Sequence, residues 1–240
     1  AAASCTHVAM EATGVYWKPV WHLLTGRFQL ILANASHIRN VPGRKSDIND
    51  ATWIADLLAH GLIESSFVPP RPIQELRELT RTRTQINREV VRHTQRIQAI
   101  LETANIKLDS VISQILGLSG RRILKALIDG ETNPETLADL GDHRLRCTRQ
   151  ELVHALQGRL TAHHRFMLQQ HLRLIEELER SLDEFDQQIE VCLRPFAEEI
   201  ERLAGVPGLG PLSVPAIVAE IGFDMERFPT SAHLVSWATL

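Results

Sequence analysis

Three carboxylates in the first fifty residues have the types and spacing that a divalent metal site requires. Glu11 follows the apolar segment 6–10, which is expected to form a strand. Asp47 and Asp50 are three residues apart at the start of a predicted helix, so both side chains project from one helix face. Carboxylate oxygens suit Mg²⁺ or Mn²⁺, and paired ions of this kind can assist phosphodiester chemistry. The spacing leaves an alternative open, since Asp-x-x-Asp is also an ordinary charged helix start.

Two cations, Arg44 and Lys45, immediately precede the aspartates. Beside a site for metal ions and phosphate they could hold a nucleic-acid backbone. As charges on a surface loop they would need no functional explanation.

Five arginines recur at spacings of four or seven along a predicted helix over residues 73–106. This spacing gives a stripe that could track a phosphate backbone, although glutamates on the same helix could pair with it as ordinary neighbours. Its surroundings favour nucleic acid: residues 71–125 carry eleven Lys or Arg against five Asp or Glu, whereas residues 126–203 carry nine against sixteen. The arginines are Arg77, Arg81, Arg88, Arg92 and Arg96.

A turn rich in glycine and proline, residues 205–211, separates two predicted helices near the C-terminal end. Gly208 and Gly210 would leave backbone N–H groups exposed at the start of the second helix, where they can bind phosphate oxygens without reading bases. A helix-hairpin-helix DNA-binding module works in this way. An ordinary connection between two helices is the alternative.

The elements that must position these residues fall into an α/β part followed by a mostly α-helical part. Predicted strands at 6–10 and 28–32 alternate with predicted helices at 14–24 and 46–60, an order that implies parallel strands. The run Pro69-Pro70-Arg71-Pro72 should end this part as a stiff linker. Residues 107–163 read as short helices, with turns predicted at Gly117, Gly120, Asn133-Pro134 and Gly141.

Apolar residues then recur every seven positions from Leu168 to Leu203, with a second series three residues later. This heptad pattern predicts a coiled coil or a long helical hairpin with the basic helix as its other arm, interrupted at Pro195. The expected division of the chain is therefore 1–68, 69–163, 164–203 and 204–240.

The composition narrows the class of protein. Hydrophobic residues make up 44% and charged residues 23% of the 240, which is ordinary for a globular protein. No apolar run approaches the length of a membrane helix, and residues 1–6 do not resemble a signal peptide, so a cytoplasmic protein without a membrane partner is expected. Three widely spaced cysteines fit neither a disulfide framework nor a zinc site.

Together these motifs resemble a known family. Residues 10–17 (MEATGVYW) look like the second acidic motif of the DEDD-type insertion-sequence transposases, the "IS one-ten" group, which is related to the Piv-type DNA invertases. Residues 43–51 (GRKSDINDA) resemble that family's Lys-x-Asp-x-x-Asp motif. Residues 206–211 (VPGLGP), followed by 219–222 (AEIG) and 227–229 (RFP), resemble the opening of its C-terminal transposase domain.

The resemblance implies a partial RuvC-like (RNase H-like) domain, a coiled-coil arm used in homo-oligomer assembly, and the start of a transposase domain containing a helix-hairpin-helix-like turn. It implies that Glu11, Asp47 and Asp50 are catalytic carboxylates that bind Mg²⁺ or Mn²⁺. It also implies metal-dependent cleavage and exchange of DNA strands between element ends and a target. In the members guided by a bridge RNA, a structured RNA specifies both DNA partners, so a guide RNA is a further candidate partner.

The chain also departs from the family's pattern. The family's first aspartate lies on a strand well before the glutamate motif, and its nucleophilic serine lies beyond the RFP segment. We therefore expect a fragment truncated at both ends that is inactive alone. Two other functions remain open: a non-catalytic coiled-coil protein for DNA binding or assembly, and a nuclease of the Holliday-junction type.

Overall fold

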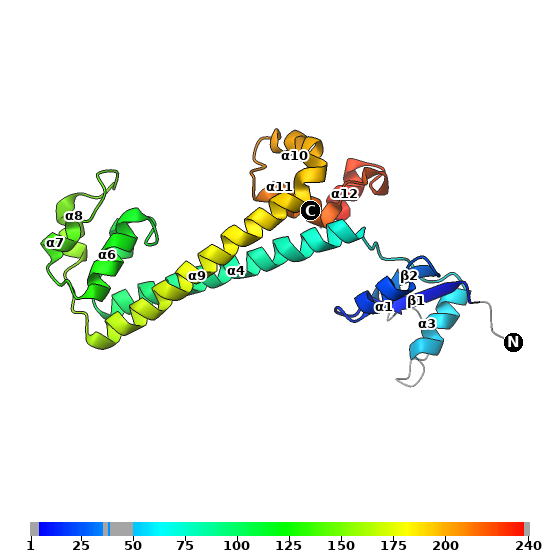
Figure 1. Ribbon diagram of the computed structural model, residues 1–240, viewed down its shortest axis with the longest axis horizontal. Coiled ribbons are helices and arrows are strands. Elements are labelled where there is room, and N and C mark those ends of the chain that lie inside the picture. The colour runs from blue at the N-terminus through cyan, green and yellow to red at the C-terminus, as the bar shows by residue number, and fades with distance from the viewer. Residues whose placement is uncertain (1–4, 36–37, 39–49, 238–240) are drawn as a thin grey trace. The chain divides into compact units, whose positions relative to one another are not determined.

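The computed structural model describes residues 5–35, 38 and 50–237, and it divides into two compact units, Ala1–Pro70 and Arg71–Leu240 (Figure 1). The first unit contains a small two-stranded sheet, and the second is helical throughout its described elements. This confirms the expected order of an α/β part followed by a mostly α-helical part. None of the described helices combines the length and the apolar composition that crossing a membrane demands.

The first unit contains β1 (His7–Glu11), α1 (Trp17–Leu24), β2 (Gln29–Ala33) and α3 (Asp50–Ala59). The strands pair in parallel, in register from His7 opposite Gln29 to Glu11 opposite Ala33, as the alternation of strands and helices predicted. Helix α1 begins three residues later than expected. Gly14 has a φ of +55°, outside the helical region, so the chain turns there before the helix starts.

A small apolar core lies under α3. Ala33 at the end of β2, Ile38 and Leu57 are buried, and Trp53 and Ile54 pack against them. Positions 53, 54 and 57 share one face of α3, as helical spacing requires, and α3 contacts β1. One face of α3 is therefore fixed against the sheet, and the first turn of the helix is fixed with it.

The second unit is built on a helical hairpin of α4 (Arg71–Thr103) and α9 (Ala162–Leu193), which pack along each other. Arg83 contacts Asp186 and His93 contacts His171, so the two helices run in opposite directions. The predicted helical hairpin is therefore formed within one chain. The linker prediction was wrong at Pro72, because the helix already begins at Arg71; proline is tolerated in a first turn, where its missing N–H would have no helical acceptor.

A cluster of short helices packs at one end of the hairpin: α5 (Leu108–Val111), α6 (Leu118–Asp129), α7 (Pro134–Ala138) and α8 (Arg149–Ala155) (Figure 1). Its core joins Ile97 and Leu101 of α4 to Leu168 and Leu172 of α9. Gly117 and Asn133, where turns were predicted, directly precede α6 and α7. Gly120 was wrongly predicted as a turn. It lies inside α6, where a Cβ would come within 2.0 Å of the Ile115 carbonyl oxygen, so glycine permits the close approach of two backbone segments.

At the other end of the hairpin, α9 stops at Leu193 and a 3₁₀ turn, Arg194–Phe196, contains Pro195, which confirms the predicted interruption. The chain continues through α10 (Ala197–Ala204), α11 (Ser213–Ile221), a second 3₁₀ turn (Met225–Arg227) and α12 (Ser231–Trp237). Leu76 of α4, Ile189 of α9 and Val218 of α11 share one buried cluster there. The C-terminal helices are thus packed onto the base of the hairpin.

Two histidines face each other in the hairpin. The Nδ1 atoms of His93 on α4 and His171 on α9 lie 2.9 Å apart, so one ring donates a hydrogen bond to the other. Burial lowers the pKa of His171, and the neighbouring His93 and Arg96 lower it further. The folded hairpin therefore favours the state in which His171 is neutral.

This histidine pair predicts that the second unit loses stability in mild acid. Because the pKa of His171 is lower in the folded than in the unfolded chain, the unfolded chain binds more protons as the pH falls below about 6.5. The free energy of unfolding should be highest above that pH and should decrease from about pH 7.5 to 5.5, where carboxylates remain ionised. Urea titrations followed by circular dichroism measure this slope. His171→Gln should flatten it, and an unchanged slope in that variant would contradict the assignment to this pair.

Candidate functional site

The structure places two of the three predicted carboxylates on elements that touch. Glu11 is the last residue of β1, and Asp50 is the first described residue of α3, the helix that contacts β1. Asp50 is spaced three, four and seven residues from Trp53, Ile54 and Leu57, so it belongs to the helix face that packs toward the sheet. Both carboxylate residues are partly buried. Asp47, Arg44 and Lys45 lie outside the described residues.

The donor chemistry of these residues fits a hard divalent cation. Glu11 and Asp50 offer only carboxylate oxygens, the ligands that Mg²⁺ and Mn²⁺ prefer. Over residues 5–35, 38 and 50–237, no three acidic, histidine or cysteine side chains gather closely enough to form a metal centre. The predicted third carboxylate, Asp47, is not among those residues, so the three-carboxylate set stays a prediction.

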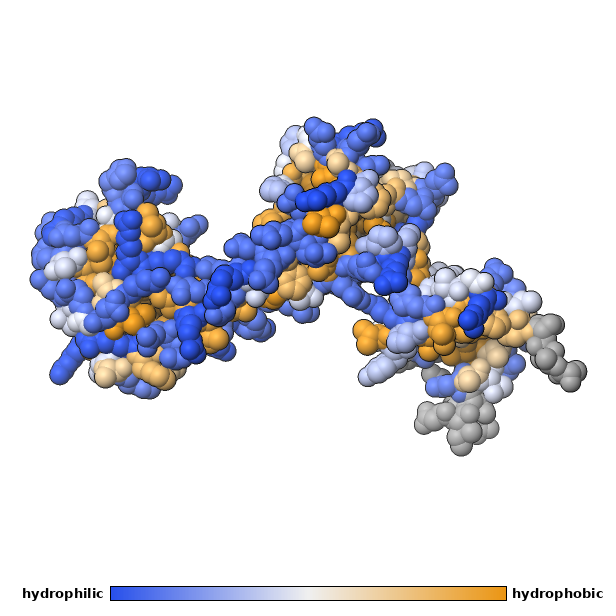
Figure 2. Space-filling view, in the orientation of Figure 1, coloured by the Kyte–Doolittle hydropathy of each residue, from blue (hydrophilic) through white to orange (hydrophobic). Residues whose placement is uncertain are grey.

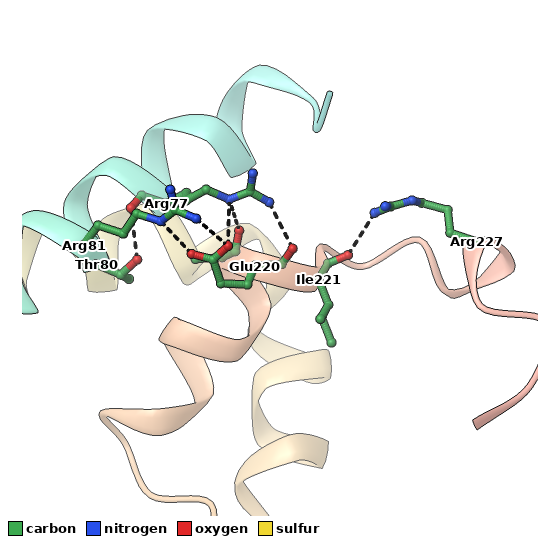
Figure 3. A network of polar contacts seen from close by, with 7 residues as sticks. Arg77, Thr80, Arg81, Glu220, Ile221 and Arg227 are labelled. Atoms are coloured by element: carbon green, nitrogen blue, oxygen red, sulfur yellow. Dashed lines mark hydrogen bonds and ion pairs between the residues drawn. The ribbon is translucent and has the colours of Figure 1, made fainter. Parts of the chain in front are cut away.

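The arginine stripe divides into two groups with different surroundings. Arg77 and Arg81, in the first part of α4, contact the end of α11, and we call these contacts the arginine clamp (Figure 3). Arg88, Arg92 and Arg96, farther along the helix, are exposed. Arg92 pairs with Glu89 on its own helix. Within the described part of the chain, Arg88 and Arg96 form no ion pair.

Arg77 caps the C-terminal end of α11. Its Nε and Nη2 atoms each donate a hydrogen bond of 2.9 Å, to the carbonyl oxygens of Ala219 and Glu220. These carbonyls lie in the last turn of α11, where the helix offers them no N–H partner. The negative end of the helix dipole also favours a cation there. Arg227 donates similarly to the carbonyl of Ile221 at 3.3 Å. The end of α11 is therefore tied both to α4 and to the segment that follows it (Figure 3).

Arg81 completes the clamp through the side chain of Glu220. Its Nε and Nη2 atoms donate to the two carboxylate oxygens at 2.8 and 2.9 Å, a bidentate geometry. This hydrogen bonding raises the pKa of Arg81, whereas burial lowers the pKa of Arg77 despite the attraction of Glu220. Both arginines remain fully charged at neutral pH. One glutamate thus compensates two cations where α4 meets α11.

The glycine turn connects α10 to α11, as predicted. Gly208 has a φ of +91°, a conformation that side-chain-bearing residues rarely adopt. At both Gly208 and Gly210, no described residue beyond the two chain neighbours has a heavy atom within 4 Å of where a Cβ would stand. The Gly210 carbonyl accepts the backbone N–H groups of Ser213 and Val214 at 3.0 and 3.1 Å, which fixes the start of α11. The turn is accessible from solvent, and phosphate binding there stays a prediction.

Sequence reasoning missed three side chains that organise this region: Glu220 of the clamp, and Asp186 and His93 of the hairpin. Arg83 lies seven residues from both Leu76 and Val90, so it falls in an apolar series that faces α9. A charge in such a series needs a partner, and this signal could have led to Asp186, which binds Arg83 through both oxygens. The sequence marks Glu220 only as a member of the segment 219–222 (AEIG), and nothing local pairs it with Arg81, which lies 139 residues away.

The clamp predicts unequal losses when its arginines are replaced by methionine, which keeps the apolar stem. Arg77→Met leaves two part-buried carbonyls without their charged donor and should cost about 1–3 kcal/mol. Arg81→Met removes a pair whose arginine is 63% exposed, so it should cost only about 0.2–1 kcal/mol. Urea unfolding, with hydrogen exchange in α11, measures both. Arg92→Met, which loses only a contact within its own helix, is the control, and an Arg77→Met effect no larger than this control would refute the clamp.

Comparison with known proteins agrees with this architecture. A family model for DEDD transposases of the IS110 type matches residues 1–106, and a model for the transposase IS116/IS110/IS902 family matches residues 200–240. Searches of curated proteins and of solved structures found no significant match. The two matched segments cover more than half of the chain, in the order that the motifs predicted, and the arginine clamp joins one segment to the other. The chain therefore belongs to the IS110 family of DEDD transposases.

Proposed function

We propose that this transposase chain contributes Glu11, Asp47 and Asp50 as the carboxylates of a metal-dependent site for cleavage and exchange of DNA strands. The DNA partners would be the ends of the element and a target. The domain that carries these residues would be of the RuvC-like, or RNase H-like, class, of which the two-stranded parallel sheet and its helices are one part.

The observation that carries this proposal is the position of Asp50 on the sheet-facing side of α3, while α3 contacts the strand that ends in Glu11. An aspartate that only complemented the helix dipole could occupy any face of the first turn. On the inner face, a carboxylate loses part of its hydration and gains most from a cation. The family match to residues 1–106 independently supports a nuclease-type role for these acidic motifs.

Each group then has a defined chemical task. Glu11, at a strand end, and the two aspartates, at a helix start, would hold the metal from two rigid elements, which limits the movement of their oxygens. When bound, Mg²⁺ or Mn²⁺ polarises the scissile phosphate and stabilises the charge that develops on its oxygens. Arg44 and Lys45 would bind neighbouring backbone phosphates and orient the strand.

The C-terminal segment would contribute DNA binding through the glycine turn. Gly208 and Gly210 leave room for a phosphate to approach the backbone closely, since no described residue beyond their chain neighbours has a heavy atom within 4 Å of either Cβ position. The start of α11 directly after the turn adds the positive end of a helix dipole. A guide RNA and assembly of a homo-oligomer through the arm stay predictions of the family resemblance.

Binding of Mn²⁺ to the purified chain tests the carboxylate site without requiring activity. Calorimetry should detect binding that weakens by about tenfold or more in Glu11→Gln, Asp47→Asn and Asp50→Asn, because each change removes one anionic ligand. The matched control is Asp56→Asn on the same helix, whose side chain is exposed. Failure of the wild-type chain to bind, or equal weakening in the control, would favour a non-catalytic assembly protein instead.

A further inference from the structure

We propose that duplex DNA lies along one face of the hairpin arm, held by the exposed guanidinium groups of Arg88, Arg92 and Arg96 on α4. This inference rests on the DNA-transposase assignment, but it does not depend on the metal site. We define the outward α4 face by five exposed residues on the side of α4 that is turned away from the seam with α9: Gln85, Arg88, Arg92, Gln95 and Arg96.

The direction of this face follows from helix geometry. Val90 and Ile97, seven residues apart, pack in the core that joins α4 to α9. With about 100° per residue, Arg88 and Arg92 point about 160° away from Val90, and Arg96 points about 120° away. The contacts of His93 and Arg83 with α9 lie on the same side as Val90. The guanidiniums of Arg88 and Arg92 therefore project away from the protein's own packing surface, whereas Arg96 lies at the margin of this face, near enough to His171 of α9 to lower its pKa.

The charge of the outward α4 face suits a polyanion. Among its described residues the face carries three arginines and no carboxylate, and its other two members are amides that can donate to phosphate or base edges. Glu89 lies at its margin and is paired with Arg92. On the side seen in Figure 2, hydrophilic residues predominate over the arm between the two ends of the second unit.

The partner helix has the opposite character, which makes the arm one-sided. Four carboxylates of α9 are exposed, namely Glu177, Asp183, Glu184 and Glu190, against two exposed arginines. One of these arginines, Arg180, is already paired with Glu177. A phosphate backbone would be repelled from α9 and attracted to α4, so the DNA has one favourable track along the hairpin rather than two.

The spacing of the arginines also fits a backbone. From Arg88 to Arg96 the helix rises about 12 Å, and over that distance one strand of duplex DNA carries about three to four phosphates. Each arginine can therefore meet its own phosphate. Arg77 and Arg81 are not members of this track, since the clamp engages their guanidiniums with α11. The five-arginine pattern thus combines two functions, the fixing of α11 and the binding of DNA.

The salt dependence of binding tests the track directly. We would measure the affinity of the full chain for a 30-base-pair duplex, in EDTA, across a range of salt concentrations. Arg88→Gln/Arg96→Gln removes two phosphate contacts and should reduce the slope of log affinity against log salt by about 1.8. Glutamine preserves helix propensity. Arg88→Lys/Arg96→Lys keeps both charges and should retain the wild-type slope.

The matched control is Arg173→Gln/Arg180→Gln, which removes two exposed arginines from α9 and changes the net charge equally. It should leave the slope unchanged. Equal losses in both glutamine variants would overturn the one-sided track, because they would indicate a general effect of net charge. If Arg88→Gln/Arg96→Gln reduced the salt slope only for a hairpin RNA probe and not for the DNA duplex, the assignment to DNA would be overturned. Since EDTA removes divalent ions, none of these outcomes depends on the carboxylates, whose failure would appear only in Mn²⁺ binding.

Discussion

The seam between α4 and α9 is the contact on which the second unit depends. Apolar residues at seven-residue intervals, such as Val90 and Ile97 on α4 and Leu168 and Ile175 on α9, would alone allow the helices to slide by a turn. Two polar pairs in the seam, Arg83 with Asp186 and His93 with His171, restrict this sliding, because a shifted register would bury them without partners. Both ends of the hairpin are packed onto this register: the short helices through Ile97 and Leu168, and the C-terminal helices through Leu76 and Ile189.

A fixed register lets α4 serve different surfaces along its length and around its axis. Near the start of α4, Leu76 packs against α11, and Arg77 and Arg81 bind the C-terminal end of α11. The segment that carries the glycine turn therefore has a defined position on the arm. Farther along, packing on α9 leaves Arg88 and Arg92 exposed on the opposite face of α4. Arginine can serve in both settings because it stays charged when partly buried and because its planar group binds carbonyls, carboxylates and phosphates alike.

Local patterns were sufficient to predict most elements but not their distant contacts. The strand order, the hairpin and the break at Pro195 follow from periodicity and proline chemistry, which act over a few residues. Gly120 was wrongly assigned to a turn because the sequence does not show why a glycine stands there. The position requires glycine because the Ile115 backbone packs against it. In a sequence, a glycine at such a close backbone contact looks the same as a glycine in a turn. The arginine stripe could not be divided for a similar reason: its first two members are defined by Glu220, far along the chain, whereas the sequence shows only their equal spacing.

The placement of Glu11 and Asp50 was more accessible to sequence reasoning than the arginine clamp, because it follows from short-range rules. A parallel strand pair fixes where β1 ends, and the helical period places Asp50 on the same side as Trp53 and Leu57. The two interpretations of Asp50, as a metal ligand or as an ordinary charge at a helix start, then differ in how well water can hydrate the carboxylate. As a simple dipole-complementing residue it would be most stable on the exposed side, where Asp56 lies on the same helix. Partial burial on the inner face requires that hydrogen-bond donors or positive charge compensate a carboxylate, whereas an exposed carboxylate is compensated by water.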